Sequence, residues 1–406
     1  MNKTNKIPKR RFPEFTDAWE VQKLEEVAEI NPKSALPDEF EYVDLESVVG
    51  TEMIAHRTEY KNSAPSRAQR LAQKGDIFYQ TVRPYQKNNY LFELNAGDKN
   101  FVFSTGYAQL RPSISSHFLF SCIQEENFVR KVLDKCTGTS YPAINANDLS
   151  KIRVCIPTNP AEQTAIGNFF GKIDRLIALN EQKLEHTQKL KKGLLQKMFP
   201  QNGQNIPEIR FPQFTDDWEL HKLGEISEKV KEKNKNREFT ETLTNSAEFG
   251  VISQRDFFDK EISNIDNIDN YYIVQNDDFI YNPRISNLAP VGPIKRNKLG
   301  RTGVMSPLYY IFRLNSDVEP SYLESYFETK IWHNFMYLNG DTGARSDRFA
   351  IKDSIFVQMP IMLPSIAEQT AIGDFFRRLD GLITLHQRKL EHLKQLKKSL
   401  LQQMFV

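Results

Sequence analysis

Two segments of this 406-residue chain occur twice, and the duplication constrains the fold more than any other feature. The opening segment IPKRRFPEFTDAWEVQKL (7–24) returns as IPEIRFPQFTDDWELHKL (206–223). The segment 161–199 returns as 367–405, with about 25 of 39 positions identical. The stretches between these repeated segments share little sequence. A repeat of this length predicts one architecture built twice, related by a pseudo-two-fold, with two different variable inserts.

Each variable insert predicts a mixed α/β (α+β) domain. The first has three short β-rich runs, a stretch with helical spacing and a closing strand: 42–48, 75–82, 99–111, 117–136 and 151–157. The second keeps that order in 277–285, 307–314, 321–338 and 355–361. The same order with different side chains predicts one fold that presents two different surfaces.

Each half is predicted to close with a long helix whose start is marked by capping residues. Ser365 can cap the second helix while Glu368, three residues on, reaches back to form a capping box. Asn159, followed by Pro160 at the first helical position and by Glu162, marks the first helix in the same way.

Beyond these starts, apolar residues recur in alternating steps of four and three, which is a heptad seam. Such a seam predicts that the two helices pair as an antiparallel coiled coil. Polar residues interrupt it at Asn180 and Lys191, and at the matching His386 and Lys397, which weakens the pairing but penalises wrong registers. The alternative is that each helix packs only on its own domain. The apolar seam residues are Ile173, Ile177, Leu184, Leu194 and Met198, and Leu379, Ile383, Leu390, Leu393, Leu400 and Met404.

Composition narrows the class of protein. A net charge of +2 argues neither for nor against a nucleic-acid partner. A mean hydropathy of −0.54 and the lack of a long apolar run predict a soluble protein with no membrane helix. The three cysteines show no CxxC spacing, which favours reduced thiols in the cytoplasm over disulfides or a zinc site.

Several motifs occur together, and their combination is similar to that of the specificity subunits of Type I restriction–modification enzymes. The motifs are Ala-Glu-Gln at 161–163 and 367–369 with Asp174 and Asp380 downstream, Gly75-Asp76-Ile77 with Arg83-Pro84, and the Phe-Pro-x-Phe-x-x-x-Trp openers at Phe12 and Phe211. The resemblance covers essentially the whole chain. In the second half, Asn276-Asp277-Asp278-Phe279-Ile280 departs from the Gly-Asp-Ile pattern, so equivalent contacts are less secure there.

The resemblance implies a non-catalytic subunit that reads a bipartite, asymmetric site in double-stranded DNA. Each target-recognition domain would read one half-site, and the paired helices would space the domains and dock two adenine-methyltransferase (modification) subunits. Restriction/translocase subunits would complete the complex. S-adenosylmethionine, ATP and Mg would be bound by those partners, and no cofactor or metal is expected in this chain. The expected domains are 1–158, 208–364, the helices 159–199 and 365–406, and the linker 200–207.

Candidate DNA contacts were sought where loops concentrate groups that can read bases. Arg and Lys suit guanine, Asn and Gln suit adenine, and small hydroxyls suit phosphates. In the first domain the candidates are Arg83, Tyr85, Gln86, Lys87, Asn88 and Asn89, with Thr139, Ser140, Tyr141 and Asn145. In the second they are Asn282, Arg284, Ser286 and Asn287, with Arg345, Ser346, Arg348 and Lys352. Ordinary solvated loops remain the alternative for each cluster.

The sequence contains no complete catalytic motif of the kinds expected for a methyltransferase, a nuclease or an ATP-driven enzyme. A phosphate-binding G-x4-GK-[ST] loop is missing, and Asn282-Pro283-Arg284-Ile285 lacks the second Pro and the aromatic residue of a methyltransferase tetrapeptide. A degenerate nuclease-like pattern at Asp38, Glu59 and Lys61 is weak, because Pro37-Asp38 reads as a turn. The expected role is therefore DNA specificity, and the alternative is a coiled-coil scaffold with two protein-binding domains.

Overall fold

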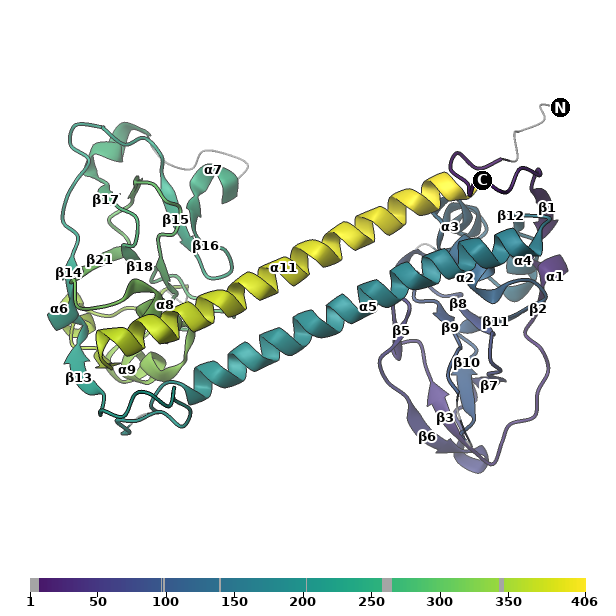
Figure 1. Ribbon diagram of the computed structural model, residues 1–406, viewed down its shortest axis with the longest axis horizontal. Coiled ribbons are helices and arrows are strands. Elements are labelled where there is room, and N and C mark those ends of the chain that lie inside the picture. The colour runs from purple at the N-terminus through teal and green to yellow at the C-terminus, as the bar shows by residue number, and fades with distance from the viewer. Residues whose placement is uncertain are drawn as a thin grey trace. The chain divides into compact units, whose positions relative to one another are not determined.

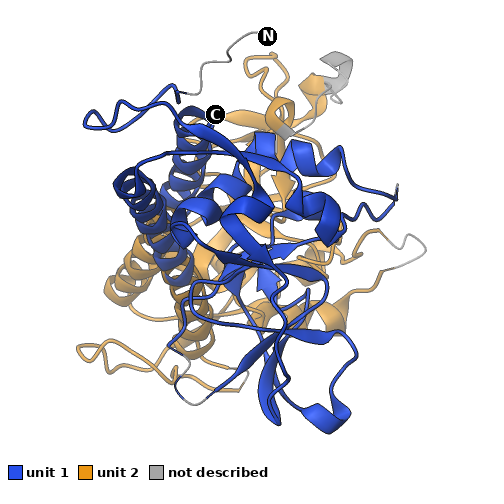
Figure 2. Cartoon of the chain, turned by 90° about the vertical axis from the view of Figure 1, so that its right-hand side faces the viewer, with its two compact units in different colours: residues 1–182, 387–406 blue, residues 183–386 orange. Residues whose placement is uncertain are grey.

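The computed structural model describes residues 7–95, 97, 99–138, 140–201, 203–257, 265–342 and 347–406 (Figure 1). The chain divides into two compact units (Figure 2): unit 1 holds residues 1–182 and 387–406, and unit 2 holds residues 183–386. The division falls inside both long helices, α5 (Pro160–Lys197) and α11 (Ile366–Met404). Each unit therefore contains the start of one long helix and the end of the other.

Among its described residues, unit 1 has two four-stranded sheets, with strand orders β2-β11-β8-β9 and β6-β3-β10-β7. The first is antiparallel and consists of β2 (Ala28–Ile30), β11 (Tyr107–Pro112), β8 (Ile77–Gln80) and β9 (Tyr90–Leu91). The second consists of β6 (Arg57–Tyr60), β3 (Glu39–Val43), β10 (Phe101–Ser104) and β7 (Ala68–Leu71), with β3 parallel to β10. The paired short strands are β1 (Glu20–Lys23) with β12 (Arg153–Ile156), and β4 (Val48–Val49) with β5 (Glu52–Met53).

Unit 2 repeats the first of these sheets in the order β14-β21-β18-β19. Its strands are β14 (Ser227–Lys229), β21 (Tyr310–Leu314), β18 (Phe279–Tyr281) and β19 (Ile294–Arg296). The pair of β13 (Glu219–Lys222) and β22 (Pro360–Leu363) repeats that of β1 and β12. Among the described residues, the second sheet of unit 1 is replaced by two antiparallel pairs, β15 (Leu243–Ser246) with β16 (Gly250–Ser253) and β17 (Tyr272–Val274) with β20 (Gly303–Met305). The predicted fold class, two α/β domains with two long helices, is confirmed.

Short helices accompany these sheets. Each of the two stretches predicted to be one helix forms two helices instead. The stretch 117–136 forms two helices, because Glu125 accepts hydrogen bonds from the amides of Asn127 and Phe128 and so starts a new helix there. The stretch 321–338 is divided in the same place. The short helices of unit 1 are α1 (Leu24–Val27), α2 (Ser116–Gln124), α3 (Glu126–Leu133), α4 (Ala146–Ser150), η1 (Lys61–Ser63) and η2 (Pro84–Gln86). Those of unit 2 are α6 (Leu223–Ile226), α7 (Gln254–Phe257), η3 (Ile265–Asn270), α8 (Pro320–Glu328), α9 (Ile331–Asn339) and α10 (Asp353–Phe356).

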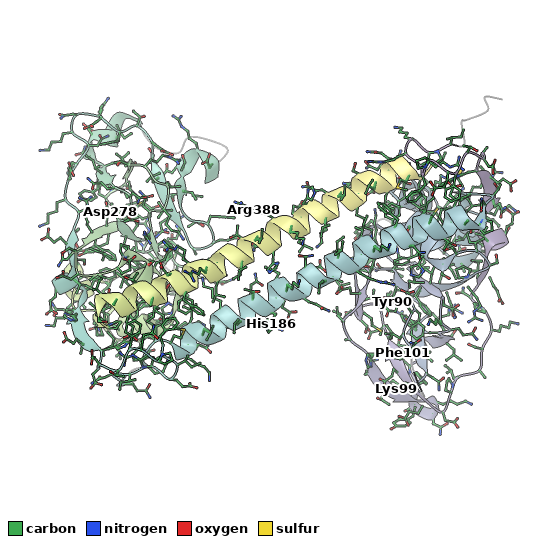
Figure 3. All side chains as sticks on the ribbon, viewed as in Figure 1. Tyr90, Lys99, Phe101, His186, Asp278 and Arg388 are labelled. Carbon is green, nitrogen blue, oxygen red and sulfur yellow. The ribbon has the colours of Figure 1, made fainter. Side chains whose placement is uncertain are left out.

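In each repeated sheet, a buried aspartate just before one strand bonds to an arginine on the neighbouring strand. Asp76 receives two hydrogen bonds from the Arg111 guanidinium, both 2.9 Å long. Asp278 (labelled in Figure 3) receives the same pair from Arg313, at 2.7 and 2.9 Å. The Gly-Asp-Ile motif of the first half therefore corresponds to Asp277-Asp278-Phe279 in the second. The departure noted in the sequence changes the glycine but keeps the aspartate that makes the contact.

The repeated Ala-Glu-Gln motif ties each long helix to its opening segment. Glu162 accepts hydrogen bonds of 2.6 and 2.7 Å from the Arg11 guanidinium. Glu368 accepts two bonds of 2.7 Å from Arg210 in the same way. The predicted role of the two glutamates in capping the helices is therefore wrong, whereas the predicted cap by Ser365 is confirmed. The Ser365 hydroxyl does accept from the Glu368 amide, but both glutamates point to the arginines, which offer stronger charge-assisted bonds.

The C-terminal ends of the long helices complete the two cores. In unit 1, Phe405 lies against Trp19, Phe118 and Phe170, with ring centroids 5.5 to 6.1 Å apart. In unit 2, Phe199 makes the equivalent ring contacts with Trp218 and Tyr322, among others. Each core is therefore closed by a helix end that arrives from another part of the chain.

Ion pairs join the long helices in each unit, and the two pairs of unit 1 show that the segments run antiparallel there. In unit 1, Asp174 pairs with Lys397 at 2.5 Å and Glu181 with Lys394 at 2.6 Å. In unit 2, Lys191 pairs with both Asp380 and Glu328 at 2.5 Å. Burial opposes the charged form of Lys191, but the two carboxylates outweigh it and raise its pKa. The predicted seam residues are all buried or half-buried.

The structure also bears on the remaining sequence predictions. No helix of the described part of the chain is long and apolar enough to cross a lipid bilayer. Cys122, Cys136 and Cys155 form no disulfide in the described part of the chain. The residues of the nuclease-like pattern lie on adjacent segments, where the Lys61 amide donates to the Asp38 carbonyl at 3.0 Å, but the Asp38 side chain is fully exposed and Glu59 pairs with Arg57. Within the described residues, no group of three or more His, Cys, Asp or Glu side chains could hold a metal ion.

Candidate nucleic-acid interface

In unit 1 the two loops that carry the predicted DNA contacts lie side by side. The loop after β8 bonds through its backbone to the loop before α4: the Arg83 amide donates to the Pro142 carbonyl at 2.8 Å. The Ile144 amide donates to the Thr81 carbonyl at 3.0 Å. Residues that are more than 50 positions apart in the sequence thus form one continuous surface, fixed at the end of a central strand.

Unit 2 builds the same pair of loops from a different sequence. The Ile285 amide donates to the Asp347 carbonyl at 3.0 Å, and the Phe349 amide donates to the Pro283 carbonyl at 2.8 Å. This register places Ile285 at the position of Arg83. Arg284 instead corresponds to Val82, so the two arginines are not equivalent. Because a shift of one residue turns a side chain to the other face of extended backbone, the two units present their arginines differently.

On the unit 1 surface, the half-buried Arg83 forms a cation–aromatic pair with the exposed Tyr141. Arg83 has a left-handed backbone with φ of 54°, and its guanidinium lies 4.3 Å from the centre of the Tyr141 ring. Tyr141 is 63% exposed, and Tyr85 and Ser140 are also exposed. A planar cation stacked on an exposed ring is a surface on which a base or sugar can lie. Thr139 lies outside the described residues.

The other unit 1 candidates already have partners within the protein. Lys87 Nζ bonds to Glu126 and to the Gln124 carbonyl, each at 2.9 Å. Asn89 is buried and accepts from the Gln80 amide, and Asn145 caps α4 by accepting from the Asp148 amide. Gln86 and Asn88 are likewise tied to Gln80. These residues shape the loops, whereas Arg83, Tyr85, Ser140 and Tyr141 are left facing outward.

In unit 2 the candidates gather around Asn282. The Asn282 amide nitrogen donates to the Asn245 carbonyl at 2.8 Å, while its oxygen accepts from the Arg284 amide at 3.0 Å. Arg284 is exposed and lies 3.8 Å from Asp347, and Arg348 is half-buried. Ser286, Asn287 and Lys352 are exposed as well. Arg345 and Ser346 lie outside the described residues.

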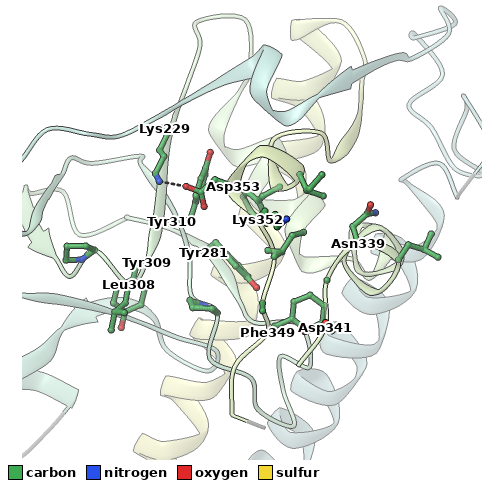
Figure 4. Close-up of a pocket in the computed structure, with 18 residues that line it drawn as sticks. Lys229, Tyr281, Leu308, Tyr309, Tyr310, Asn339, Asp341, Phe349, Lys352 and Asp353 are labelled. Atoms are coloured by element: carbon green, nitrogen blue, oxygen red, sulfur yellow. Dashed lines mark hydrogen bonds and ion pairs between the residues drawn. The ribbon is translucent and has the colours of Figure 1, made fainter. Parts of the chain in front are cut away.

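Two cavities adjoin the paired loops of unit 2 and share Pro283, Leu308 and Tyr309. One, of about 900 Å³, is lined by Lys229, Tyr281, Tyr310, Phe349 and Lys352 (Figure 4). The Lys229 ammonium pairs with Asp353 at 2.5 Å and lies 4.9 Å from the centre of the Tyr310 ring. Burial raises the pKa of Tyr310 to about 12, so its hydroxyl stays a neutral donor.

The second cavity, of about 540 Å³, is lined by four of the predicted residues: Asn282, Arg284, Ser286 and Arg348. Its wall also includes Asn245 on β15 and Gln254 on α7, neither of which was predicted. Both belong to segments that read as an ordinary polar hairpin in the sequence. Only the packing of that hairpin against the loop after β18 brings them to the site, so no local signal marks them.

The chain is 23% identical to the MjaX type I restriction enzyme specificity subunit of Methanocaldococcus jannaschii over 304 residues. That alignment covers 70% of this chain and 65% of the relative, which is just under two thirds of its length.

Two solved structures share the fold. The Type-I restriction–modification S subunit of M. genitalium has a TM-score of 0.61 at 14% identity, covering 98% of this chain and 99% of that one. A chain solved in work on complex assembly and conformational transition of the type I R-M system has a TM-score of 0.51 at 19% identity, covering 94% and 96%. The sequence profile of the Type I restriction modification DNA specificity domain matches residues 16–188 and 215–395. The chain therefore belongs to the Type I restriction–modification DNA specificity family.

Proposed function

We propose that this chain is the specificity subunit of a Type I restriction–modification complex and reads a bipartite, asymmetric site in double-stranded DNA. One half-site would be read by residues 1–158 and the other by residues 208–364, with 159–199 and 365–406 as the spacer helices and 200–207 as the linker. The observation that carries the proposal is the pair of bonded loops that is built in both units by the same backbone contacts. Their side chains differ, as two unlike half-sites require.

The chemistry of each loop pair supports this assignment. Unit 1 offers the stacked Arg83 and Tyr141, and unit 2 offers Arg284 and Arg348 beside an asparagine-lined cavity. Arginine can bond to guanine through two donors or to phosphate, and an amide side chain can bond to adenine or cytosine. Catalysis would come from partner subunits that bind S-adenosylmethionine, ATP and Mg.

An exposed set of leucines on the long helices supports docking of two modification subunits. In unit 1 the set is Leu176, Leu179 and Leu396, and in unit 2 it is Leu382, Leu385 and Leu190. These side chains are 40% to 58% exposed, and the repeat relates each to a counterpart. Apolar groups that recur on the surface mark contact sites for other proteins. Two equal sets fit two copies of one partner.

The proposal is tested by expressing the chain with a modification subunit of its own system and mapping methylated adenines across the host genome. We expect a split motif that is absent when the chain is left out. Replacing 224–366 by the matching segment of another family member should change one half of the motif and keep the other. If the co-purified complex adds no methylated motif, the chain does not specify DNA for that methyltransferase.

A further inference from the structure

We infer that the 540 Å³ cavity of unit 2 reads a base that carries an exocyclic amino group, adenine or cytosine, through Asn245 and Gln254. The inference rests on the proposed function and adds to it the residues that set one position of the half-site. It starts from two buried amide oxygens, on residues that line the cavity, which lack hydrogen-bond partners among the described residues.

Asn245 presents an oxygen because its nitrogen is fully used. The residue is 2% exposed, and its amide nitrogen donates to the Ile280 carbonyl at 2.7 Å and to the Pro293 carbonyl at 3.2 Å. A flipped amide would place its oxygen against both carbonyls, so the observed orientation is the stable one. The Oδ1 atom is consequently an acceptor with nothing to accept from in the described structure.

The Gln254 side chain, which comes from a different element, also directs its amide nitrogen to a backbone carbonyl. It is the first residue of α7, and its amide nitrogen faces the Leu243 carbonyl at 3.5 Å. Its Oε1 is buried and has no partner among the described residues. Leaving a buried acceptor unpaired costs about 1–3 kcal/mol. Two such acceptors in one cavity are accounted for if a bound group donates N–H bonds to them.

The surroundings of the cavity select the kind of donor. Arg284 and Arg348 also line it and suit the phosphates of a nucleic acid, while Pro293, Leu288 and Tyr309 give it apolar walls against which the edge of a paired base can lie. Adenine N6 and cytosine N4 are the amino donors that bases show in the major groove, where guanine O6 and thymine O4 are acceptors. Two amide oxygens therefore accept adenine or cytosine and disfavour guanine and thymine.

The test uses the full chain with its modification subunit and duplexes randomised in the half-site that unit 2 reads, with methylation counted by sequencing. Gln254→Leu removes the acceptor at similar size on a half-exposed helix, so it should fold. We expect the preference for an amino-bearing base to fall about 10- to 100-fold at one position of that half-site, with the other half unchanged. The matched control is Gln358→Leu, an exposed glutamine of unit 2 outside this cavity.

A second probe removes the amino group from the DNA instead of the acceptor from the protein. At the position found above, purine replaces adenine, or 2-pyrimidinone replaces cytosine. The unaltered chain should lose about 10- to 100-fold in methylation efficiency, whereas Gln254→Leu should lose almost nothing further. The inference is overturned if the folded variant keeps every base preference, or if the affected position prefers guanine or thymine. A complex that yields no methylated motif at all overturns the proposed function as well.

Discussion

Asp277 takes a backbone conformation that usually belongs to glycine. Its φ is 70°, and the matching residue of unit 1, Gly75, has φ of 91°. A short polar side chain is among the few that tolerate the left-handed region. The Asp277 carboxylate also accepts a hydrogen bond of 2.7 Å from Arg296, which is half-buried. An aspartate can therefore stand in place of the glycine without moving the buried aspartate that follows it, because Asp277 tolerates the left-handed backbone and bonds to Arg296.

His333 should make the stability of unit 2 depend on pH. Burial beside the Trp332 ring, with Lys330 nearby, lowers its pKa from 6.5 to about 4. Because the folded-state pKa is the lower one, the stabilisation is complete above pH 6.5 and is lost as the pH falls toward 4. We expect His333→Gln to flatten the fall in unfolding free energy over that range, measured by urea titration. His392→Gln, on an exposed face of α11, corrects for loss of an imidazole, and equal slopes in both variants would contradict the expectation.

At the scale of elements, the two long helices are fixed at both ends. Their N-terminal glutamates hold arginines of the opening segments, and their C-terminal phenylalanines sit in aromatic clusters. Between these ends, lysines at seam positions meet Asp174 and Asp380. A carboxylate near a helix N-terminus is also favoured by the helix dipole. The repeated motifs thus fix position and register, which explains why they recur while the inserts differ.

The glutamate–arginine pairs should carry a large part of the stability of each unit. Replacing Glu368 by Gln leaves the nearly buried Arg210 without a counter-charge, and breaking such a pair costs about 3–5 kcal/mol. We expect a loss of that size in the free energy of unfolding of unit 2, followed by urea denaturation. The control is Glu219→Gln, because that carboxylate is exposed and should change stability by less than about 0.5 kcal/mol. A loss below about 1 kcal/mol for Glu368→Gln would contradict this account.

The elements also show what could be predicted from the sequence. Periodicity and capping residues located both long helices, because these signals are local. They did not reveal that Glu162 binds Arg11, since these residues are 151 positions apart and only the folded chain brings them together. The loops proposed to read DNA could be predicted because polar turns follow recognisable strands. Asn245 and Gln254 were missed because their role depends on which carbonyls their amides face, and sequence pattern does not record that.

For the whole molecule, the repeat implies that each unit carries its own docking site. The leucine sets lie on the part of each long helix that belongs to one unit, so altering one set should leave the other intact. In unit 1, Leu176→Glu with Leu179→Glu places two charges where an apolar partner surface would pack. Leu176 and Leu179 are each 45% exposed, so covering one contributes about 0.7–1.3 kcal/mol and losing both should weaken that contact about 10- to 100-fold.

We expect complexes of this variant to hold one modification subunit where the unaltered chain holds two, as measured by native mass spectrometry at fixed subunit concentration. Leu382→Glu with Leu385→Glu should give the same single occupancy through unit 2, and the combined variant should bind none. Lys172→Glu makes the same change in net charge on an exposed face of α5 and should keep both partners. Retention of two subunits by the leucine variants would place docking elsewhere, and that result would leave the proposal for the paired loops unaffected.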